Sequence, residues 1–188
     1  MSGEQKEGRF EITEKKLEIN ISSEKDLAQV EQLLSPIFGT EAAAQCAFVL
    51  STFATEDYAN RCNEATQEFA RRLARRYGDE ESFFDTAPTT TFIDARTYET
   101  LREQGYRGNH HSVALLESKS KNNPPITVIF DLTYYTVAPD AKKESALVLP
   151  INGQVAQALQ KLKQHYGATW QAEWIFDPKK KTFNFQDT

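Results

Sequence analysis

Hydrophobic residues in the first half of the chain recur every three or four positions, which is the spacing of amphipathic helices. Residues 10–21 instead alternate loosely between apolar and polar, as in a strand or hairpin. Ser23 suits the N-cap of the first helix, which Ser35-Pro36 should end, and Thr40 suits the cap of the second. The helices are expected at about residues 23–35, 40–53 and 60–77.

From His110 onward the spacing becomes that of strands. Two runs, HHSVALLE and ITVIFDLTYYTV, flank a polar connection and are expected to pair as antiparallel strands. ALVLPI predicts a further buried strand, residues 154–166 a helix, and WQAEWIFDPKKKTFNF a hairpin turning at Asp177-Pro178. Residues 79–109 are expected to form a loop with a short helix. Helices followed by an antiparallel β-sheet define an α+β fold.

The length of 188 residues, without a linker rich in Pro, Gly or Ser, predicts one domain over residues 9–188. Residues 1–8 are polar and are expected to form a disordered tail. The composition is 39% hydrophobic and 26% charged, as in proteins that fold around a core. The oligomeric state does not follow from the sequence.

The net charge of -5 gives no general attraction to the phosphates of a nucleic acid, so nucleic acid is not an expected partner. No run approaches the roughly 18 apolar residues of a membrane span, and the N-terminus lacks the layout of a signal peptide. Two cysteines, Cys46 and Cys62, suit a reducing compartment. A cytoplasmic protein is expected, although one exported by a dedicated secretion system would look the same.

Cys62 falls in the first turn of the third expected helix, where the unpaired amide groups and the helix dipole favour a thiolate. A thiolate nucleophile needs a base, and His110 and His111 open the first strand of the pair. Side chains alternate along a strand, so at most one of the two faces the helix. Asp131, on the next strand, could orient that imidazole.

Each of these residues also has a structural interpretation. Cys62 fits the apolar stripe of its helix, and Cys46, inside AAAQCAFVL, is expected to be a core residue. Asp131 lies among apolar residues and should have a partner, which could be a backbone amide or an arginine. A zinc site from Cys62 and the histidine pair has no supporting ligand spacing, so no metal is expected.

The segments NRCNEAT, HHSVALLE and TVIFDLTYY, within residues 55–137, resemble the nucleophile, histidine and aspartate segments of papain-like and transglutaminase-like cysteine enzymes. The resemblance implies a papain-like/transglutaminase-like core and a Cys62-His111-Asp131 triad. It favours His111 because a small residue and Val follow it, and leaves His110 as the alternative base.

The resemblance further implies an enzyme without a cofactor that acts on an amide or acyl bond of a protein or peptide, as a protease, deamidase or acyltransferase. Several relatives are bacterial toxins or effectors, a role that the small size and acidic charge would suit. The sequence lacks a Gly-Cys-Trp signature and an upstream Gln for the oxyanion hole. The Cys62 N–H and the Asn60 side chain are the candidate donors, although Asn60 is equally explained as an N-cap.

The alternative function is a non-enzymatic protein-binding module, such as an inactive relative of the same fold. Its contact surface would be formed by aromatic residues of the C-terminal hairpin. These are Trp170, Trp174, Phe176, Phe183 and Phe185. On alternating strands, however, most of them are expected to pack on the core.

Overall fold

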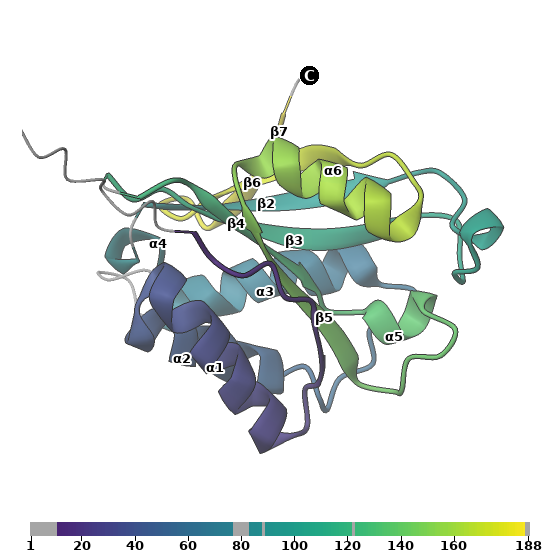
Figure 1. Cartoon of the computed structure of the whole chain (residues 1–188), viewed down its shortest axis with the longest axis horizontal. Helices are drawn as coiled ribbons and strands as arrows, with labels where there is room; N and C mark the ends of the chain where they lie inside the picture. Colours follow the sequence, from purple (N-terminus) through teal and green to yellow (C-terminus); the bar gives the residue numbers. More distant parts are fainter. Residues whose placement is uncertain (1–10, 77–82, 88, 122, 187–188) are drawn as a thin grey trace, which may run out of the picture.

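The computed structural model describes residues 11–76, 83–87, 89–121 and 123–186. The expected tail at residues 1–8 lies outside these ranges. Within them, seven strands form one antiparallel sheet in the order β1-β5-β4-β3-β2-β6-β7 (Figure 1). The strands are β1 (Leu17–Asn20), β2 (Thr90–Thr97), β3 (His111–Ser118), β4 (Ile126–Asp131), β5 (Ser145–Asn152), β6 (Gln171–Asp177) and β7 (Thr182–Phe185).

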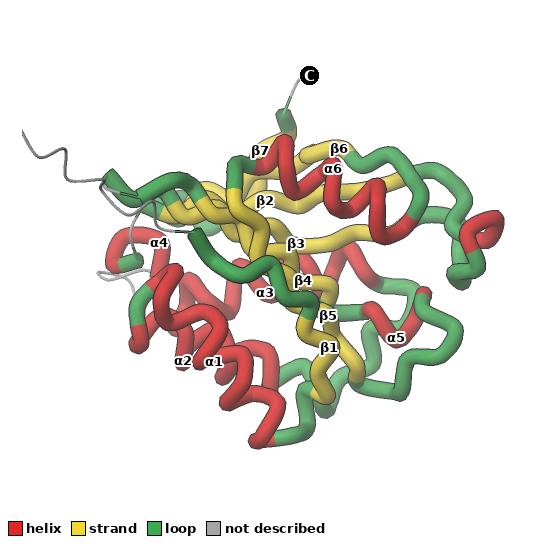
Figure 2. The backbone as a smooth tube through the Cα atoms, in the orientation of Figure 1, coloured by secondary structure: helices red, strands yellow, loops and turns green. Residues whose placement is uncertain are grey.

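Helices cover both faces of this sheet (Figures 1 and 2). The helices are α1 (Glu24–Phe38), α2 (Thr40–Ser51), α3 (Cys62–Arg76), α4 (Phe83–Thr86), α5 (Tyr134–Val137) and α6 (Val155–Tyr166), with a 3-10 turn, η1, at Arg102–Gln104. The first three lie on one face and α6 on the other. The expected α+β class is confirmed.

Side-chain alternation along the strands divides the core into two clusters. On β4, Val128 and Phe130 pack with α1, α2 and α3, whereas Ile129 packs toward α6. The strands β3 and β4 are buried along their whole length, because helices cover both of their faces. These two buried strands hold the histidine and the aspartate singled out by the sequence.

The first two helices differ from expectation at their ends. The N-cap role of Ser23 is confirmed, since its side chain accepts a hydrogen bond from the Asp26 amide at 3.3 Å. The predicted end at Ser35-Pro36 is wrong, because α1 continues through Pro36 to bury Ile37 and Phe38. Burial of these two side chains compensates for the hydrogen bond that proline cannot donate. Thr40 is also not a cap, because Gly39 is the residue before α2.

The main error of the sequence interpretation is the loop predicted over residues 79–109, because β2 occupies Thr90–Thr97. This strand pairs with β3 along its full length and with β6 on its other side. The sequence pattern did not indicate this strand because it has polar residues at buried positions. The carboxylate of Asp94 is fully buried, and its ion-pair partner Arg96 lies 2.7 Å away. The strand that was expected to run to Val137 also ends early, at Asp131, where the chain turns into α5.

The C-terminal hairpin is formed by β6 and β7, as predicted. Trp170 and Phe176 are buried in the two core clusters. Trp174 and Phe183 are partly buried, and only Phe185 of the five hairpin aromatics is largely exposed, at 58%. The hairpin therefore presents little of the aromatic contact surface that the binding-module alternative requires.

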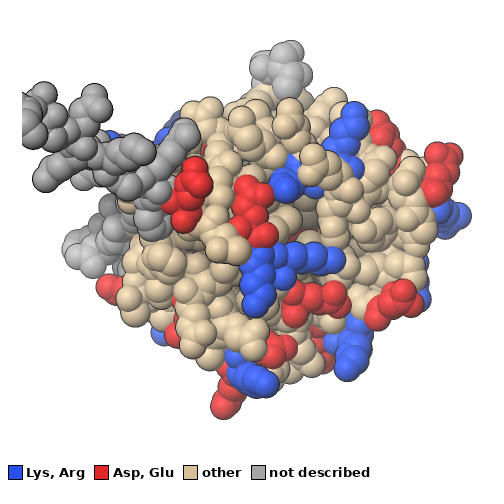
Figure 3. Space-filling model, in the orientation of Figure 1, with Lys and Arg blue, Asp and Glu red and all other residues tan. Residues whose placement is uncertain are grey.

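Charged side chains of both signs are interspersed on the face seen in Figure 3, without a large patch of one sign. Among the described residues, none of the helices combines the length and the apolar character needed to cross a membrane.

Phe69 links α3 to the sheet. It is fully buried, and its ring lies 5.0 Å from that of Phe130 and 6.0 Å from that of Phe92. We predict that Phe69→Ala lowers the free energy of unfolding by about 3–5 kcal/mol in urea titrations, because it leaves a cavity beneath the sheet. On the same helix, Arg75→Ala should change it by less than about 0.5 kcal/mol. Equal losses from both would contradict this packing.

Candidate active site

The turn before α3 sets the position of Cys62. The Arg61 amide donates to the Tyr58 carbonyl at 2.8 Å, and the Arg61 carbonyl accepts the first helical hydrogen bond, from Ala65, at 3.0 Å. Arg61 is therefore the N-cap, and Cys62 is the first residue of the helix. The interpretation of Asn60 as an N-cap is wrong. Its backbone is left-handed, with φ 61°, a conformation that Asn tolerates better than most residues.

His111 is the first residue of β3 and is buried, with 1% of its surface exposed. Strand alternation puts its ring on the α6 side of the sheet, together with Val113. Because His111 is the first residue of the strand, its ring also reaches the start of α3, close enough to interact with the thiol of Cys62. Of the two candidate histidines, His111 is the one that approaches the cysteine helix.

His110, the alternative base, precedes β3 and is exposed. It lines the same cavity as Cys62, but its side chain has no hydrogen-bond or ion-pair partner among the described residues. Because it lies before the strand, the alternation argument does not apply to it. The structure thus gives His111, and not His110, a contact with both the thiol and a carboxylate.

Asp131 ends β4 and is fully buried. Its Oδ2 lies 2.8 Å from Nε2 of His111 and also accepts a hydrogen bond from the Tyr166 hydroxyl. Its Oδ1 accepts one from the Thr133 amide at 3.2 Å. Both carboxylate oxygens are satisfied, as a buried charge requires. The contact through Nε2 leaves Nδ1 of the His111 ring for the thiol.

These contacts change the ionisation of the cysteine and the histidine. Burial favours the neutral thiol, but the hydrogen bond and the charge of His111, helped by the Ser112 amide, outweigh it and lower the pKa of Cys62. Burial likewise opposes a charged imidazole, but Asp131 raises the pKa of His111 to about 10. Both shifts favour a thiolate paired with an imidazolium.

An aromatic wall encloses the His111-Asp131 pair on the α6 side. The ring centroid of Trp170 lies 6.1 Å from that of His111, edge to face, and that of Tyr166 lies 5.9 Å away. The two aromatic rings are themselves 5.2 Å apart. This wall keeps water from the pair, which strengthens the attraction between its charges.

The second cysteine has none of these features. Cys46 lies in the middle of α2, is fully buried, and belongs to the core cluster of that face. Burial raises the pKa of the Cys46 thiol well above its ordinary value. Its predicted role as a core residue is confirmed.

A cavity of about 400 Å³ opens beside Cys62. It is lined by residues at the start of α3, by Arg102 and residues 107–111, and by the end of α5. The volume falls within the range of about 300–1,000 Å³ that is usual for small-molecule sites. Asn60 lines this cavity beside the thiol, where its side-chain amide could donate to an oxyanion.

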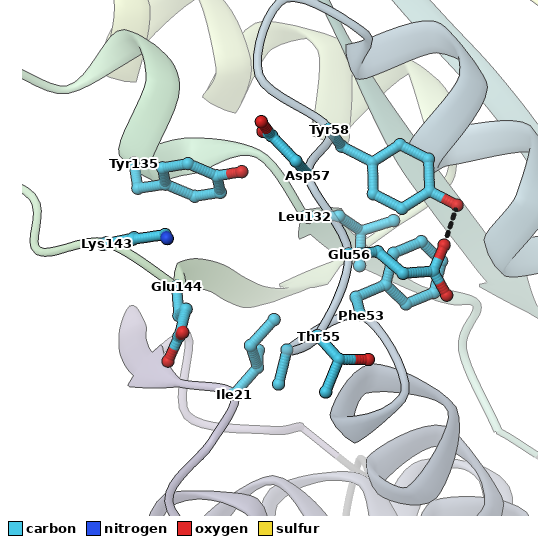
Figure 4. A pocket seen from close by; sticks show the side chains of 11 residues that line it. Ile21, Phe53, Thr55, Glu56, Asp57, Tyr58, Leu132, Tyr135, Lys143 and Glu144 are labelled. Carbon is cyan, nitrogen blue, oxygen red and sulfur yellow. Dashed lines mark hydrogen bonds between the residues drawn. The ribbon is translucent and has the colours of Figure 1, made fainter.

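A second pocket, of about 160 Å³, lies next to the segment that leads into α3 (Figure 4). Glu56, Asp57 and Glu144 line it, with Lys143 as the one cation. The Tyr58 hydroxyl donates to Glu56 at 2.7 Å along its edge. None of its lining residues is a cysteine or a histidine, so it holds no nucleophile and base comparable to Cys62 and His111.

Within the described ranges, no three His, Cys, Asp or Glu residues are grouped so that they could hold a metal ion. Comparison with known proteins gave no matching family model, no matching curated protein and no matching solved structure. The site is therefore interpreted from its own geometry.

Tyr166 is the site residue that the sequence did not reveal. Helical spacing placed it at the end of α6, where only packing was expected. The sole hint was that Asp131 needed a buried partner, and nothing local connects two residues that are 35 positions apart.

We predict that Tyr166→Phe lowers the free energy of unfolding by roughly 1.5–3 kcal/mol, because it removes a hydrogen bond to a buried charge. Tyr106→Phe is the matched control. The Tyr106 hydroxyl donates to the carbonyl of His165 at 2.9 Å, a neutral acceptor, so its loss should lower the free energy by only about 0.5–1.5 kcal/mol. Urea titrations measure both, and an equal loss would contradict a charged Asp131.

Proposed function

We propose that this protein is a cysteine-nucleophile enzyme of the papain-like kind, acting on an amide or ester bond through Cys62, His111 and Asp131. The observation that carries the proposal is the chain of contacts from the thiol of Cys62 through His111 to the buried Asp131. A nucleophile, a base that contacts it and a third group that orients the base are the parts needed for acyl transfer.

The surroundings of the three residues support this proposal. The cysteine begins a helix that packs on an antiparallel sheet, and the histidine and aspartate belong to the neighbouring strands β3 and β4. One strand, β2, intervenes in the chain between α3 and the histidine strand. The order of cysteine helix, histidine strand and aspartate strand is nevertheless the one expected of a papain-like core. The thiol also lines a cavity, so a carbonyl carbon could reach it.

In the proposed first half-reaction, the Cys62 thiolate attacks the carbonyl carbon and the carbonyl electrons move onto oxygen. The Cys62 amide and the Asn60 side chain are the candidate donors to that oxyanion. When the intermediate collapses, the leaving group departs with a proton from the His111 imidazolium. The product is a thioester on Cys62 and a neutral His111.

In the second half-reaction, water or an amine attacks the thioester while His111 accepts its proton. Collapse releases the acyl product and restores the thiolate beside the imidazolium. Water as acceptor makes the enzyme a protease or a deamidase, and an amine makes it an acyltransferase. All three activities share the first half-reaction, which can be tested without knowing the natural substrate.

The test is acyl transfer from p-nitrophenyl acetate. We predict a burst of nitrophenol and a single acetyl group on Cys62, located by mass spectrometry after acid quench. His111→Ala should slow the burst by a factor on the order of 10²–10⁴, because the base is lost. Asp131→Asn should also slow it, because the amide can hold the wrong histidine tautomer.

Two matched variants serve as controls. His110→Ala removes a histidine from the same cavity, and Cys46→Ala removes a thiol from the core, so both should acetylate Cys62 at close to the wild-type rate. Acetylation spread over surface lysines, or a burst unchanged in Cys62→Ala, would contradict a cysteine nucleophile. Equal small effects of His110→Ala and His111→Ala would remove histidine from the mechanism.

A further inference from the structure

The cavity beside Cys62 differs in charge from the protein as a whole. The chain has a net charge of -5, yet among the described residues no aspartate or glutamate lines this cavity, whereas Arg102 and Arg107 both do. The pocket lined by residues 53–58 has the opposite character, because three carboxylates and one lysine line it among the described residues. The excess of positive charge is therefore local to the cavity that holds the thiol.

Neither of these two arginines is neutralised. Within the described ranges, Arg102 and Arg107 have no carboxylate oxygen within 4.0 Å, the limit for an ion pair. Most of the other described arginines have a carboxylate partner. Those with an ion pair are Arg61, Arg71, Arg72, Arg75 and Arg96. A guanidinium that lines a cavity without a carboxylate partner can bind an anion from outside the chain.

The segment that carries the arginines is anchored at several points. The Arg107 amide donates to the Val137 carbonyl at 2.6 Å, and its Nη2 donates to the Pro139 carbonyl at 3.1 Å. Leu101, next to Arg102, is fully buried. The anchored Arg107 keeps Nε and Nη1 for another acceptor, and a guanidinium fork matches the paired oxygens of a carboxylate or a phosphate.

The reacting groups give the cavity wall a reason to be positive. The Cys62 thiolate, the His111 imidazolium and the Asp131 carboxylate together carry one net negative charge. This cluster would repel an anionic substrate group, and the two arginines in the wall offset that repulsion.

We propose that Arg102 and Arg107 form a subsite for a carboxylate or phosphate group of the substrate, close to the carbonyl that Cys62 attacks. This inference rests on the proposed function, which it makes more specific. The substrate class is an amide or ester with an anionic group beside the reacting bond.

The test compares two alkylating reagents of nearly equal size, neutral iodoacetamide and anionic iodoacetate, on Cys62 of the full chain. The ratio of the iodoacetate rate to the iodoacetamide rate reports the attraction of an anion into the cavity. We expect Arg102→Gln and Arg107→Gln each to lower this ratio by roughly three- to tenfold, the effect of one unit charge in a partly solvated cavity. The iodoacetamide rate should change less than about twofold, which also reports that the site is intact.

Arg76→Gln is the matched control. It removes the same charge at the far end of α3, about 21 Å from Cys62 at 1.5 Å per residue, which is beyond the screening length of about 10 Å at 0.1 M salt. The charges of Cys62, His111 and Asp131 act on iodoacetate in every variant, so the test compares only the differences between variants. An equal fall in Arg76→Gln would overturn the subsite, as would an unchanged ratio in both cavity variants while Cys62 still reacts.

A second arm distinguishes the two anions. Inorganic phosphate and acetate, at matched ionic strength, are tested for protection of Cys62 against iodoacetamide. Protection by either, lost in Arg102→Gln and Arg107→Gln, supports the subsite and names its chemistry, whereas protection by neither contradicts it. If Cys62 reacts with neither alkylating reagent in the folded protein, the proposed function itself fails, an outcome distinct from loss of the anion preference alone.

Discussion

A buried carboxylate is the constraint on which the candidate site depends. Asp131 is fully removed from solvent, and an unpaired charge in that position would be strongly destabilising. Its partners come from three parts of the fold, namely His111 on β3, Tyr166 on α6 and the Thr133 amide in the turn after β4. The charge therefore ties the second helical layer to the sheet. It also favours the protonated form of His111, which in turn favours the thiolate of Cys62.

Periodicity was sufficient to predict most elements of the fold, because burial of one face fixes the spacing of apolar residues. Periodicity failed where polar residues are buried, and where the burial of apolar residues keeps a helix going past a proline. Asp94 in β2 is buried with Arg96 as its partner, a pairing that the sequence pattern does not reveal. Pro36 stays inside α1 because Ile37 and Phe38 behind it are buried.

For the site, the residue types and their order were predictable, but their contacts were not. Cys62, His111 and Asp131 follow from a thiol at a helix start and polar residues on two buried strands. Strand alternation was expected to turn one histidine toward the thiol. The contact depends instead on the position of His111 as the first residue of β3. Tyr166 and the two cavity arginines could be identified only from the tertiary structure, because they are distant in sequence from Asp131 and Cys62.

The central claim is that Cys62 is held as a thiolate by His111, and a pH titration of ultraviolet thiolate absorbance tests it most directly. The difference between the wild type and Cys62→Ser isolates this thiol, because Cys46 is present in both. The account predicts a midpoint below the ordinary thiol value of about 8.5, and its return toward that value in His111→Ala. A wild-type midpoint at or above the ordinary value, unchanged by His111→Ala, would contradict the account.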